Sequence, residues 1–377
     1  MNIIKIKWIT LAICLFTVGL WGKTTINNPK KPVNSNSGRQ IPLKILATFA
    51  DDGENFFFKW PSHIKISPNG SLYALDQDQL ILLSPEGKFI KNLWQKGQGA
   101  SEMVNVSDYI LLPNNEVMVH NLYPNKMLSF DGAGKYIQEK RLEPNKPMTF
   151  FHQDSEHYYF YREYLPETKG RAIEGVVDVQ IFRVSKKDNS YNKLMSFPVI
   201  NYFFRVPNNI FQIRTTRFLI EHFKENKFWV AHTADYKIKL IDLNSQKILM
   251  EFNRPYNRIE VTEKNKEYIT RGGFVIDDIQ YKSPIPKYMN DVQSIHAVAG
   301  KLWVFTSTVT DKGVLVDVFD EHGKYVDCFY LKFRYERSDY RVEQSQLTKI
   351  NNYIYYVEQN PDEDWAITKY EMPASLK

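Results

Sequence analysis

The chain has 377 residues, of which 43% are hydrophobic and 14% aromatic, so it can bury a large core and is not disordered as a whole. Six of its 49 basic residues lie in residues 1–42, which contain no acidic residue, so residues 43–377 carry 43 charges of each sign. This balance removes the electrostatic basis for nucleic-acid binding, and we expect no nucleic-acid partner.

Residues 1–22 have the pattern of an export signal. Two lysines precede a nearly unbroken apolar run of 14 residues, Trp8 to Trp21, and this run is shorter than the roughly 20 apolar residues that span a membrane. We predict a signal peptide and an exported protein, periplasmic or extracellular. An uncleaved anchor formed by residues 8–21 is the alternative, and it is the only membrane contact that we expect.

The two cysteines restrict the chemistry of the chain. Cys14 lies in the apolar run, and Ile13 before it excludes lipoprotein processing, which needs a small residue there. Once the signal is removed only Cys328 remains, so neither an internal disulfide nor a thiolate metal cluster can form.

Residues 23–42 are polar and rich in Pro, Asn and Ser, without apolar periodicity. We predict a flexible linker outside the fold. Residues 43–373 are expected to form one domain and residues 374–377 a tail, and we expect a monomer.

A hairpin signature recurs along this domain. Leu83–Ile90, Phe130–Ile137 and Phe319–Val326 each join an apolar strand end to a turn with glycine, then lysine and a new alternating strand. Glycine suits the turn position that requires positive φ. A looser copy spans Asp242–Lys247.

A second signature, a turn followed by four or five β-formers, lies upstream of the hairpins. Its six copies are SLYAL (71–75), EVMVH (116–120), HYYFY (157–161), KFWVA (227–231), KLWVF (301–305) and YIYYV (353–357). Where no insertion intervenes they are roughly 40–50 residues apart, the spacing of four-stranded propeller blades. We predict an all-β, six-bladed β-propeller in which Leu43–Phe49 supplies the outer strand of the last blade, because such closure removes exposed edges.

The pattern resembles the NHL-like and TolB-like six-bladed propellers of exported bacterial proteins, over about residues 43–373. Lys96–Met103 (KGQGASEM) is similar to the Gly-x-Gly-Pro-Gly-Glu-Phe turn after the first blade in one exported branch, with Ala100, Ser101 and Met103 in place of Pro, Gly and Phe. The resemblance implies a fold and an exported location but no single function, since propellers host many.

In this fold, the loops before the inner strands and those after the second strands share one face, at the mouth of the central channel. The first position is held by His63, Asp108, Thr149, Leu219, Gln293 and Ser345, and the second by Asp76, Asn121, Arg162, His232, Thr306 and Glu358. We take His63, Asp76, Asp108, Asn121, Arg162 and His232 as candidate ligand-binding residues. The alternative is that they cap strands and turns, as such residues commonly do.

Two connectors are longer than the fold requires. Residues 198–217 contain Arg205, Arg214 and Arg217 without an acidic residue, and residues 253–290 contain a candidate short helix, Thr262–Arg271. We expect both at the channel mouth, either as functional lids or as tolerated insertions. Their positive charge would favour an acidic or sugar-acid ligand, unless acids in the blades balance it.

Familiar catalytic motifs are absent from the sequence: it has no Gly-x-Ser-x-Gly elbow, phosphate loop, His-Glu-x-x-His or dinucleotide fingerprint. Asp76 and Asp78, with Asp362 and Asp364, lie in equivalent loops of neighbouring blades, but a calcium loop needs more oxygen ligands and a glycine turn. We therefore favour surface turn acids and expect no cofactor, with calcium as the alternative.

Two functions remain open. The first is a non-enzymatic binding or scaffold propeller that recognises a protein, peptide or glycan at the channel mouth. The second is a divalent-metal-dependent hydrolase or lyase of the lactonase or esterase kind, with its site in the channel. Asn121 and Glu358 are the residues that such a metal set could recruit, and the missing motifs favour the first function.

Overall fold

The computed structural model describes residues 24–142, 148–164, 173–206, 209–213, 216–263, 266, 274–276, 279–281, 285–335, 342–373 and 376. The predicted signal, residues 1–22, lies outside them. In this described part of the chain no helix is long and apolar enough to cross a membrane.

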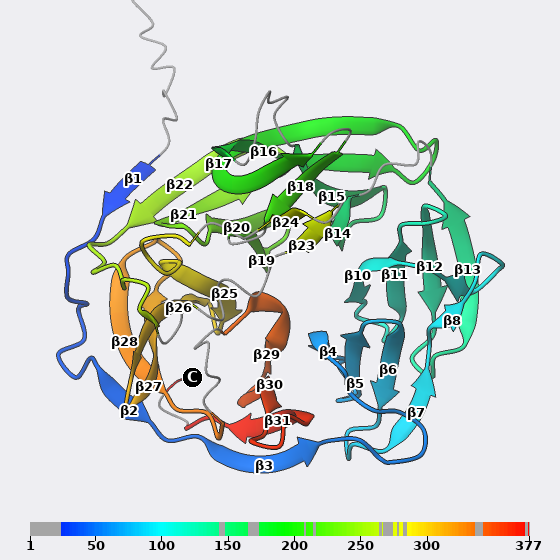
Figure 1. The fold of residues 1–377 in the computed structure, drawn as a ribbon, viewed down its shortest axis with the longest axis horizontal. Helices are drawn as coiled ribbons and strands as arrows, with labels where there is room; N and C mark the ends of the chain where they lie inside the picture. The colour runs from blue at the N-terminus through cyan, green and yellow to red at the C-terminus, as the bar shows by residue number, and fades with distance from the viewer. Residues whose placement is uncertain are drawn as a thin grey trace, which may run out of the picture.

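Six antiparallel sheets stand around a central axis, each with its first strand innermost (Figure 1). The first three blades are formed by β4 (Ser62–Ile66), β5 (Leu72–Asp76), β6 (Gln79–Leu83) and β7 (Phe89–Asn92); β10 (Val106–Leu111), β11 (Val117–Asn121), β12 (Lys126–Phe130) and β13 (Tyr136–Arg141); and β14 (Thr149–Gln153), β15 (His157–Tyr164), β16 (Ile173–Ser185), β17 (Tyr191–Val206) and β18 (Asn209–Ile213).

The fourth to sixth blades take strands from both ends of the chain. They are formed by β19 (Phe218–Lys224), β20 (Lys227–His232), β21 (Asp235–Asp242) and β22 (Lys247–Asn253); β25 (Val292–Val298), β26 (Lys301–Thr310), β27 (Gly313–Phe319) and β28 (Tyr325–Leu331); and β29 (Leu347–Ile350), β30 (Tyr353–Gln359), β31 (Trp365–Glu371) and β3 (Lys44–Phe49). Antiparallel pairing of β3 with β31 closes the ring, and the predicted six-bladed propeller with this closure is confirmed.

The core lies between the blades. Its six apolar clusters correspond to the six contacts between neighbouring blades; in one of them Tyr73 and Leu82 of the first blade pack against Val119 and Leu128 of the second. A blade is therefore buried on both faces, and β5, β11 and β12 are buried at every position. This double burial explains why the six β-former runs are continuous rather than alternating.

The hairpin glycines adopt the conformation that the sequence predicts. Gly87, Gly134 and Gly323 have φ of 88°, 75° and 72°, in the left-handed region that glycine enters without steric cost.

Within the Lys96–Met103 segment, the side chain of Glu102 packs against the two glycines and holds the loop in shape. Gly99 N–H donates to the Glu102 carboxylate at 2.7 Å, and a Cβ on Gly97 would lie 2.0 Å from that carboxylate. The fully buried Lys126 ties the loop to the second blade through the Gly99 carbonyl and the Glu139 carboxylate, at 2.7 and 2.6 Å. These glycines and this glutamate thus shape the connection between the first two blades.

The prediction that residues 23–42 form a linker outside the fold does not hold. β1 (Thr24–Asn27) pairs in parallel with β22, and β2 (Arg39–Ile41) pairs in parallel with β28, as fifth strands of the fourth and fifth blades. The segment runs along the outside of the ring (Figure 1). Such short polar strands are stable there because the outermost strand of a blade offers unpaired backbone groups.

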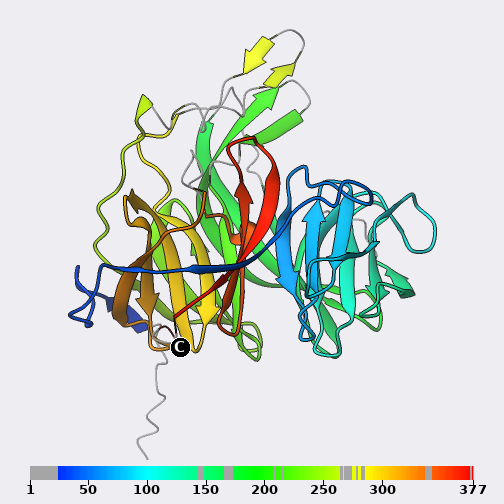
Figure 2. The same ribbon diagram turned by 90° about the horizontal axis from the view of Figure 1, so that it is seen from below.

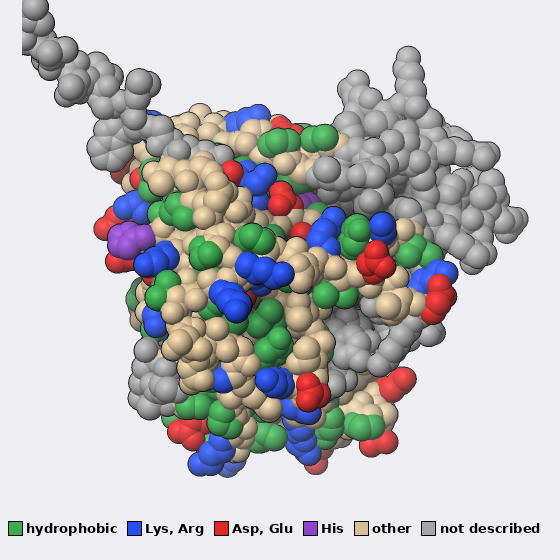
Figure 3. Space-filling model, turned by 90° about the vertical axis from the view of Figure 1, so that its left-hand side faces the viewer, with side chains coloured by type: hydrophobic (Ala, Val, Ile, Leu, Met, Phe, Trp, Pro, Cys, Tyr) green, Lys and Arg blue, Asp and Glu red, His purple; other side chains and the backbone are tan. Residues whose placement is uncertain are grey.

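Side chains anchor this outer segment. The Asn28 amide donates to the carbonyls of Asn253 and Gly323 at 3.1 and 2.9 Å, and its oxygen accepts from Tyr325 N–H at 2.8 Å. Arg39 forms two hydrogen bonds to the Asp327 carboxylate, at 3.0 and 2.9 Å. On this side of the molecule basic and acidic side chains are interspersed (Figure 3).

The extra strands of the insertions rise from one side of the ring (Figure 2). The ends of β16 and β17 project there, as do β18 and the β23 (Phe274–Ile276) and β24 (Ile279–Tyr281) hairpin. Because β18 leads directly into β19, this is the side on which the inner strands begin. The predicted helix Thr262–Arg271 lies mostly outside the described residues.

If the outer segment is part of the fold, replacement of Asn28 by alanine will lower the free energy of unfolding by about 2 kcal/mol, because it leaves the buried Gly323 carbonyl and Tyr325 N–H without their side-chain partner. Denaturant unfolding measures this change. Asn36→Ala is the matched control, since Asn36 is exposed in the same segment. Equal stability of both variants would restore the linker prediction.

Candidate functional site

Most inner strands carry an irregularity where they face the channel. The pairing of the inner with the second strand shifts register in five blades, and the strands concerned are β4, β10, β14, β19 and β25. A bulge puts one extra residue on the inner strand and redirects its side chains. Polar residues are thereby presented to the axis from strands whose faces are otherwise buried against other blades.

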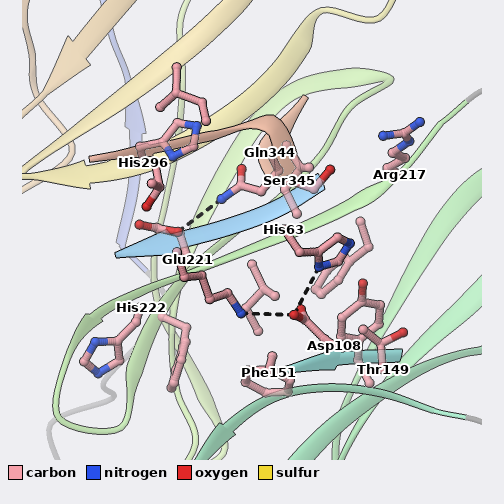
Figure 4. A pocket seen from close by; sticks show the side chains of 18 of the residues that line it. His63, Asp108, Thr149, Phe151, Arg217, Glu221, His222, His296, Gln344 and Ser345 are labelled. Carbon is pink, nitrogen blue, oxygen red and sulfur yellow. Dashed lines mark hydrogen bonds and ion pairs between the residues drawn. The ribbon is translucent and has the colours of Figure 1, made fainter. Parts of the chain in front are cut away.

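A cavity of about 500 Å³ occupies the centre of the ring and is lined by residues from all six blades (Figure 4). Of the residues predicted at the start of the inner strands, His63, Asp108, Thr149, Leu219 and Ser345 line it. Gln293 does not line it and is instead hydrogen-bonded to Ser307 in a buried position.

His63, Asp108 and Lys65 form a charged cluster between the first and second blades. The Asp108 Oδ1 atom lies 3.1 Å from His63 Nδ1 and 3.0 Å from Lys65 Nζ. Burial alone would raise the pKa of Asp108, but the nearby Lys65 and His63 outweigh it and hold this pKa below its usual range. Asp108 is therefore an ionised acceptor in this wall of the cavity.

Glu221 joins three blades on the opposite wall (Figure 4). Its carboxyl accepts from Ala297 N–H at 3.0 Å and from the Gln344 side chain at 3.1 Å. Burial raises the pKa of Glu221 from its ordinary 4.5 to about 7, with Lys65 opposing the shift. Gln344 belongs to the short 3₁₀ turn η1 (Gln344–Gln346), which precedes β29.

His296, next to Ala297, is a further buried polar group of the wall. It is 6% exposed, and in the described structure its Nε2 atom has no hydrogen-bond partner. Burial lowers the pKa of His296 to about 3, so the ring is neutral.

Aromatic rings cover the third-blade and fourth-blade side of the cavity. Phe151 packs against Tyr161 and Phe228 with ring centroids 6.2 and 5.4 Å apart, and Tyr161 lies 5.5 Å from Phe218. All four rings line the cavity, so this side presents aromatic surface next to polar groups such as Thr149 and Glu163.

Arg217 marks the mouth side of the cavity. It forms two hydrogen bonds, at 2.5 and 2.9 Å, to the carboxylate of Glu343, the residue before η1. This pair connects the start of β19 to the start of the sixth blade. The side chain of Arg205 and all of Arg214 lie outside the described residues.

Two of the candidates after the second strands, Asp76 and Asn121, fasten neighbouring loops. Asp76 accepts from Lys59 and Trp60 N–H at 2.6 and 2.7 Å, and Asn121 accepts from Val104 and Asn105 N–H at 2.8 and 3.0 Å. These bonds fasten the loop that leads into each blade, across 16 or 17 residues in sequence.

The fourth and fifth blades use the next residue for the same purpose. Thr233 accepts from Arg217 N–H at 2.8 Å, again across 16 residues, and Ser307 donates to the Asn290 carbonyl. The capping alternative therefore describes this position better than ligand binding. Thr306 donates to the Leu315 carbonyl at 3.2 Å, within its own blade.

Arg162 and His232 are not among the residues that line the cavity. The Arg162 guanidinium lies 4.8 Å from the ring of Tyr164. Burial lowers the pKa of His232 to about 4.

Sequence reasoning missed the polar residues further along the inner strands. Five further residues line the cavity and lie two to four residues beyond the positions that the repeat aligned: Lys65, Glu221, His222, His296 and Lys349. The available signal was a charged or imidazole side chain inside SHIKI, FLIEHFK, VQSIHAV and LTKI, strands that are otherwise apolar.

The residues recruited for a metal set are already engaged. Asn121 is held as described above, and Glu358 accepts from Tyr370 O–H at 2.5 Å and from Tyr335 N–H at 3.3 Å. In the described residues no group of three or more His, Cys, Asp or Glu side chains is arranged to hold a metal ion. The wall does not fit a lactonase-type calcium set, because Asp108 is paired with Lys65 and the Glu221 carboxyl accepts hydrogen bonds from protein donors.

Comparisons with known proteins agree with this architecture. Residues 53–236 match the model of the family DUF5128, described as a 6-bladed beta-propeller. The chain is a six-bladed β-propeller. A solved DUF4221 member from Bacteroides vulgatus is 11% identical, with a TM-score of 0.53, and covers 89% of this chain and 99% of its own. None of the curated proteins matches the sequence.

Two further solved structures are similar to this propeller. A Bacteroides fragilis protein thought to be exported is 10% identical, with a TM-score of 0.51, over 93% of this chain and all of its own. The virginiamycin B lyase of Staphylococcus aureus is 16% identical, with a TM-score of 0.43, over 89% of this chain and all of its own. Identities this low establish the fold alone.

Because the folded state binds the Glu221 proton more tightly than the unfolded state, this residue stabilises the fold fully below pH 4.5 and loses that contribution as the pH rises through about 7. Thermal unfolding from pH 4.5 to 8 will therefore show a stability advantage of wild type over Glu221→Gln that shrinks with rising pH. The buried histidines have lowered pKa values and act in the opposite sense, so only the difference between the two proteins reports Glu221. A pH-independent difference would contradict the buried position of its carboxyl.

Proposed function

We propose that this propeller is an exported binding protein whose central cavity takes one unit of a neutral glycan. The observation that carries the proposal is the cavity itself, which is about 500 Å³ and has a wall from every blade. That volume lies within the roughly 300–1,000 Å³ of small-molecule sites.

The charge of the wall supports a neutral ligand. Three basic side chains, Lys65, Arg217 and Lys349, face three acidic ones, Asp108, Glu163 and Glu221. Two of the basic groups are already paired, Lys65 with Asp108 and Arg217 with Glu343. The positive field that would favour an acidic ligand is therefore not a property of this wall.

The distribution of polar and aromatic groups supports a polyhydroxylated ligand. Thr149, Ser345 and Thr348 line the cavity, and the described structure shows no hydrogen-bond partner for their side-chain hydroxyls. The aromatic rings of Phe151, Tyr161, Phe218 and Phe228 line the same cavity, and Tyr161 is the strand partner of Thr149. A sugar ring has both complements, hydroxyl groups at its edge and apolar C–H faces that pack against aromatic rings.

Export is supported by the apolar run after two lysines in residues 1–22. The Bacteroides fragilis neighbour that is thought to be exported has the same fold. An exported protein is exposed to glycans outside the cytoplasm, which agrees with a binding role.

A glycan array that carries neutral and acidic oligosaccharides will test this function. We expect the purified protein to bind neutral glycans and Ser345→Trp to lose at least tenfold in affinity, because the indole fills the cavity. The matched control is Ser35→Trp, at an exposed position of the outer segment, which will bind as wild type does. Binding confined to peptides or acidic glycans, or retained by Ser345→Trp, would contradict the proposal.

Thermal unfolding with and without metal ions separates this proposal from the alternative, a metal-dependent hydrolase or lyase. We expect the unfolding temperature to be the same in EDTA and after addition of calcium or other divalent ions, because the wall carboxyls are held by protein donors. A rise of several degrees that saturates with one ion would demonstrate a native-state ion site and would favour the enzyme.

A further inference from the structure

His63 has a backbone conformation unlike that of the other strand residues. Its φ is 47°, and among the described non-glycine residues with positive φ it is the only one inside a strand, the others lying in turns and loops. Histidine reaches this region only at a steric cost of about 1 kcal/mol or more. Strain of this kind persists where the surrounding structure imposes it, and it is concentrated at functional sites.

The bulge in β4 imposes this conformation. Ser62 pairs with Leu75 and Lys65 pairs with Tyr73, so two residues, His63 and Ile64, stand opposite Ala74. Ile64 is buried between the sixth and first blades, while His63 lines the cavity with 31% of its side chain exposed. The bulge thus directs the imidazole to the axis while Ile64 keeps its place in the core.

The second blade fixes the imidazole ring. Asp108 Oδ1 lies 3.1 Å from His63 Nδ1 and also accepts from Tyr109 N–H at 2.7 Å, and the Tyr109 hydroxyl donates to the His63 carbonyl. An ionised carboxylate can only accept hydrogen bonds, so the Nδ1 atom carries a proton. In the tautomer with its single proton on Nδ1, the Nε2 atom presents a lone pair, and it has no hydrogen-bond partner in the described structure (Figure 4).

We propose that His63 is the specificity-determining residue of the channel: its Nε2 atom is a fixed acceptor that selects a ligand with a hydroxyl or amide N–H donor at this point. The inference rests on the proposed glycan-binding function, and it specifies the hydrogen-bond donor that the ligand must present to His63. A buried acceptor rejects an analogue that lacks the matching donor, because the acceptor is left unpaired in the complex.

The tautomer can be measured without any ligand. Histidine side-chain ¹⁵N NMR of the purified protein should show His63 with its proton on Nδ1, against exposed His322 as internal reference. The Asp108→Ala variant should lose this preference, because the acceptor that holds the proton is gone. A proton on Nε2 in the wild type would overturn the assignment, whatever the ligand.

Recognition can be measured with two sugar probes by saturation-transfer NMR. The wild type should bind methyl β-glucoside at least about tenfold more tightly than its tetra-O-methyl ether, in which every hydroxyl donor is capped. His63→Asn should remove this preference. Asparagine tolerates positive φ, and its amide N–H can still donate to Asp108, but it has no atom at the Nε2 position.

The outcomes separate the two proposals. Equal discrimination by wild type and His63→Asn, with equal unfolding temperatures, would overturn the role of His63 and leave the glycan function intact. Failure of the wild type to bind either sugar would count against the glycan function. The ¹⁵N NMR measurement would still test the assigned tautomer of His63, because it needs no ligand. The unfolding temperature of His63→Asn shows whether lost binding reflects the missing atom or a damaged fold.

Discussion

The pairing of β3 with β31 holds the ring together, because it completes the last blade with a strand that precedes the first blade in sequence. Each blade buries both faces against its neighbours, so no blade has a complete core of its own. Without β3 the edge of β31 would be exposed. The apolar contact between the sixth and first blades would also lack Phe49. The parallel additions of β1 and β2 extend the same principle around the fourth and fifth blades.

The cavity is a consequence of this closure. Six inner strands that converge on one axis leave a space that their own side chains must fill or line. In this chain the bulged inner strands turn imidazole, carboxyl and ammonium groups toward the axis, and the cross-blade bonds of Glu221 and of the Arg217–Glu343 pair hold the walls in register. The site is therefore built in large part from contacts between blades, which position Asp108, Glu221 and Arg217.

The fold was predictable because the second-strand runs and the hairpin turns recur at blade spacing, and each copy is local. The outer strands β1 and β2 were not, because TTIN and RQI are short and polar and gain their pairing from edges more than 200 residues away in sequence. The site was predictable in part. His63 and Asp108 stand where inner strands begin, whereas Glu221 and His296 lie further along strands that pack between other blades, where the sequence pattern does not show which side chains face the axis. Asp76 and Asn121 were recognised as recurring polar positions, but the sequence pattern does not separate a residue that fastens a leading loop from one that contacts a ligand.

The order in which the ribosome makes this chain is the reverse of the order in which its ring can be completed. Residues 24–49 emerge first, yet their partners β22, β28 and β31 end at residues 253, 331 and 371. Early blades can assemble as they appear, but the first-made segment stays without a partner until the last blades exist, and such distant contacts form slowly. A chain that crosses a membrane N-terminus first would carry its own closing strands across ahead of everything they close, so the finished propeller could form only on the far side.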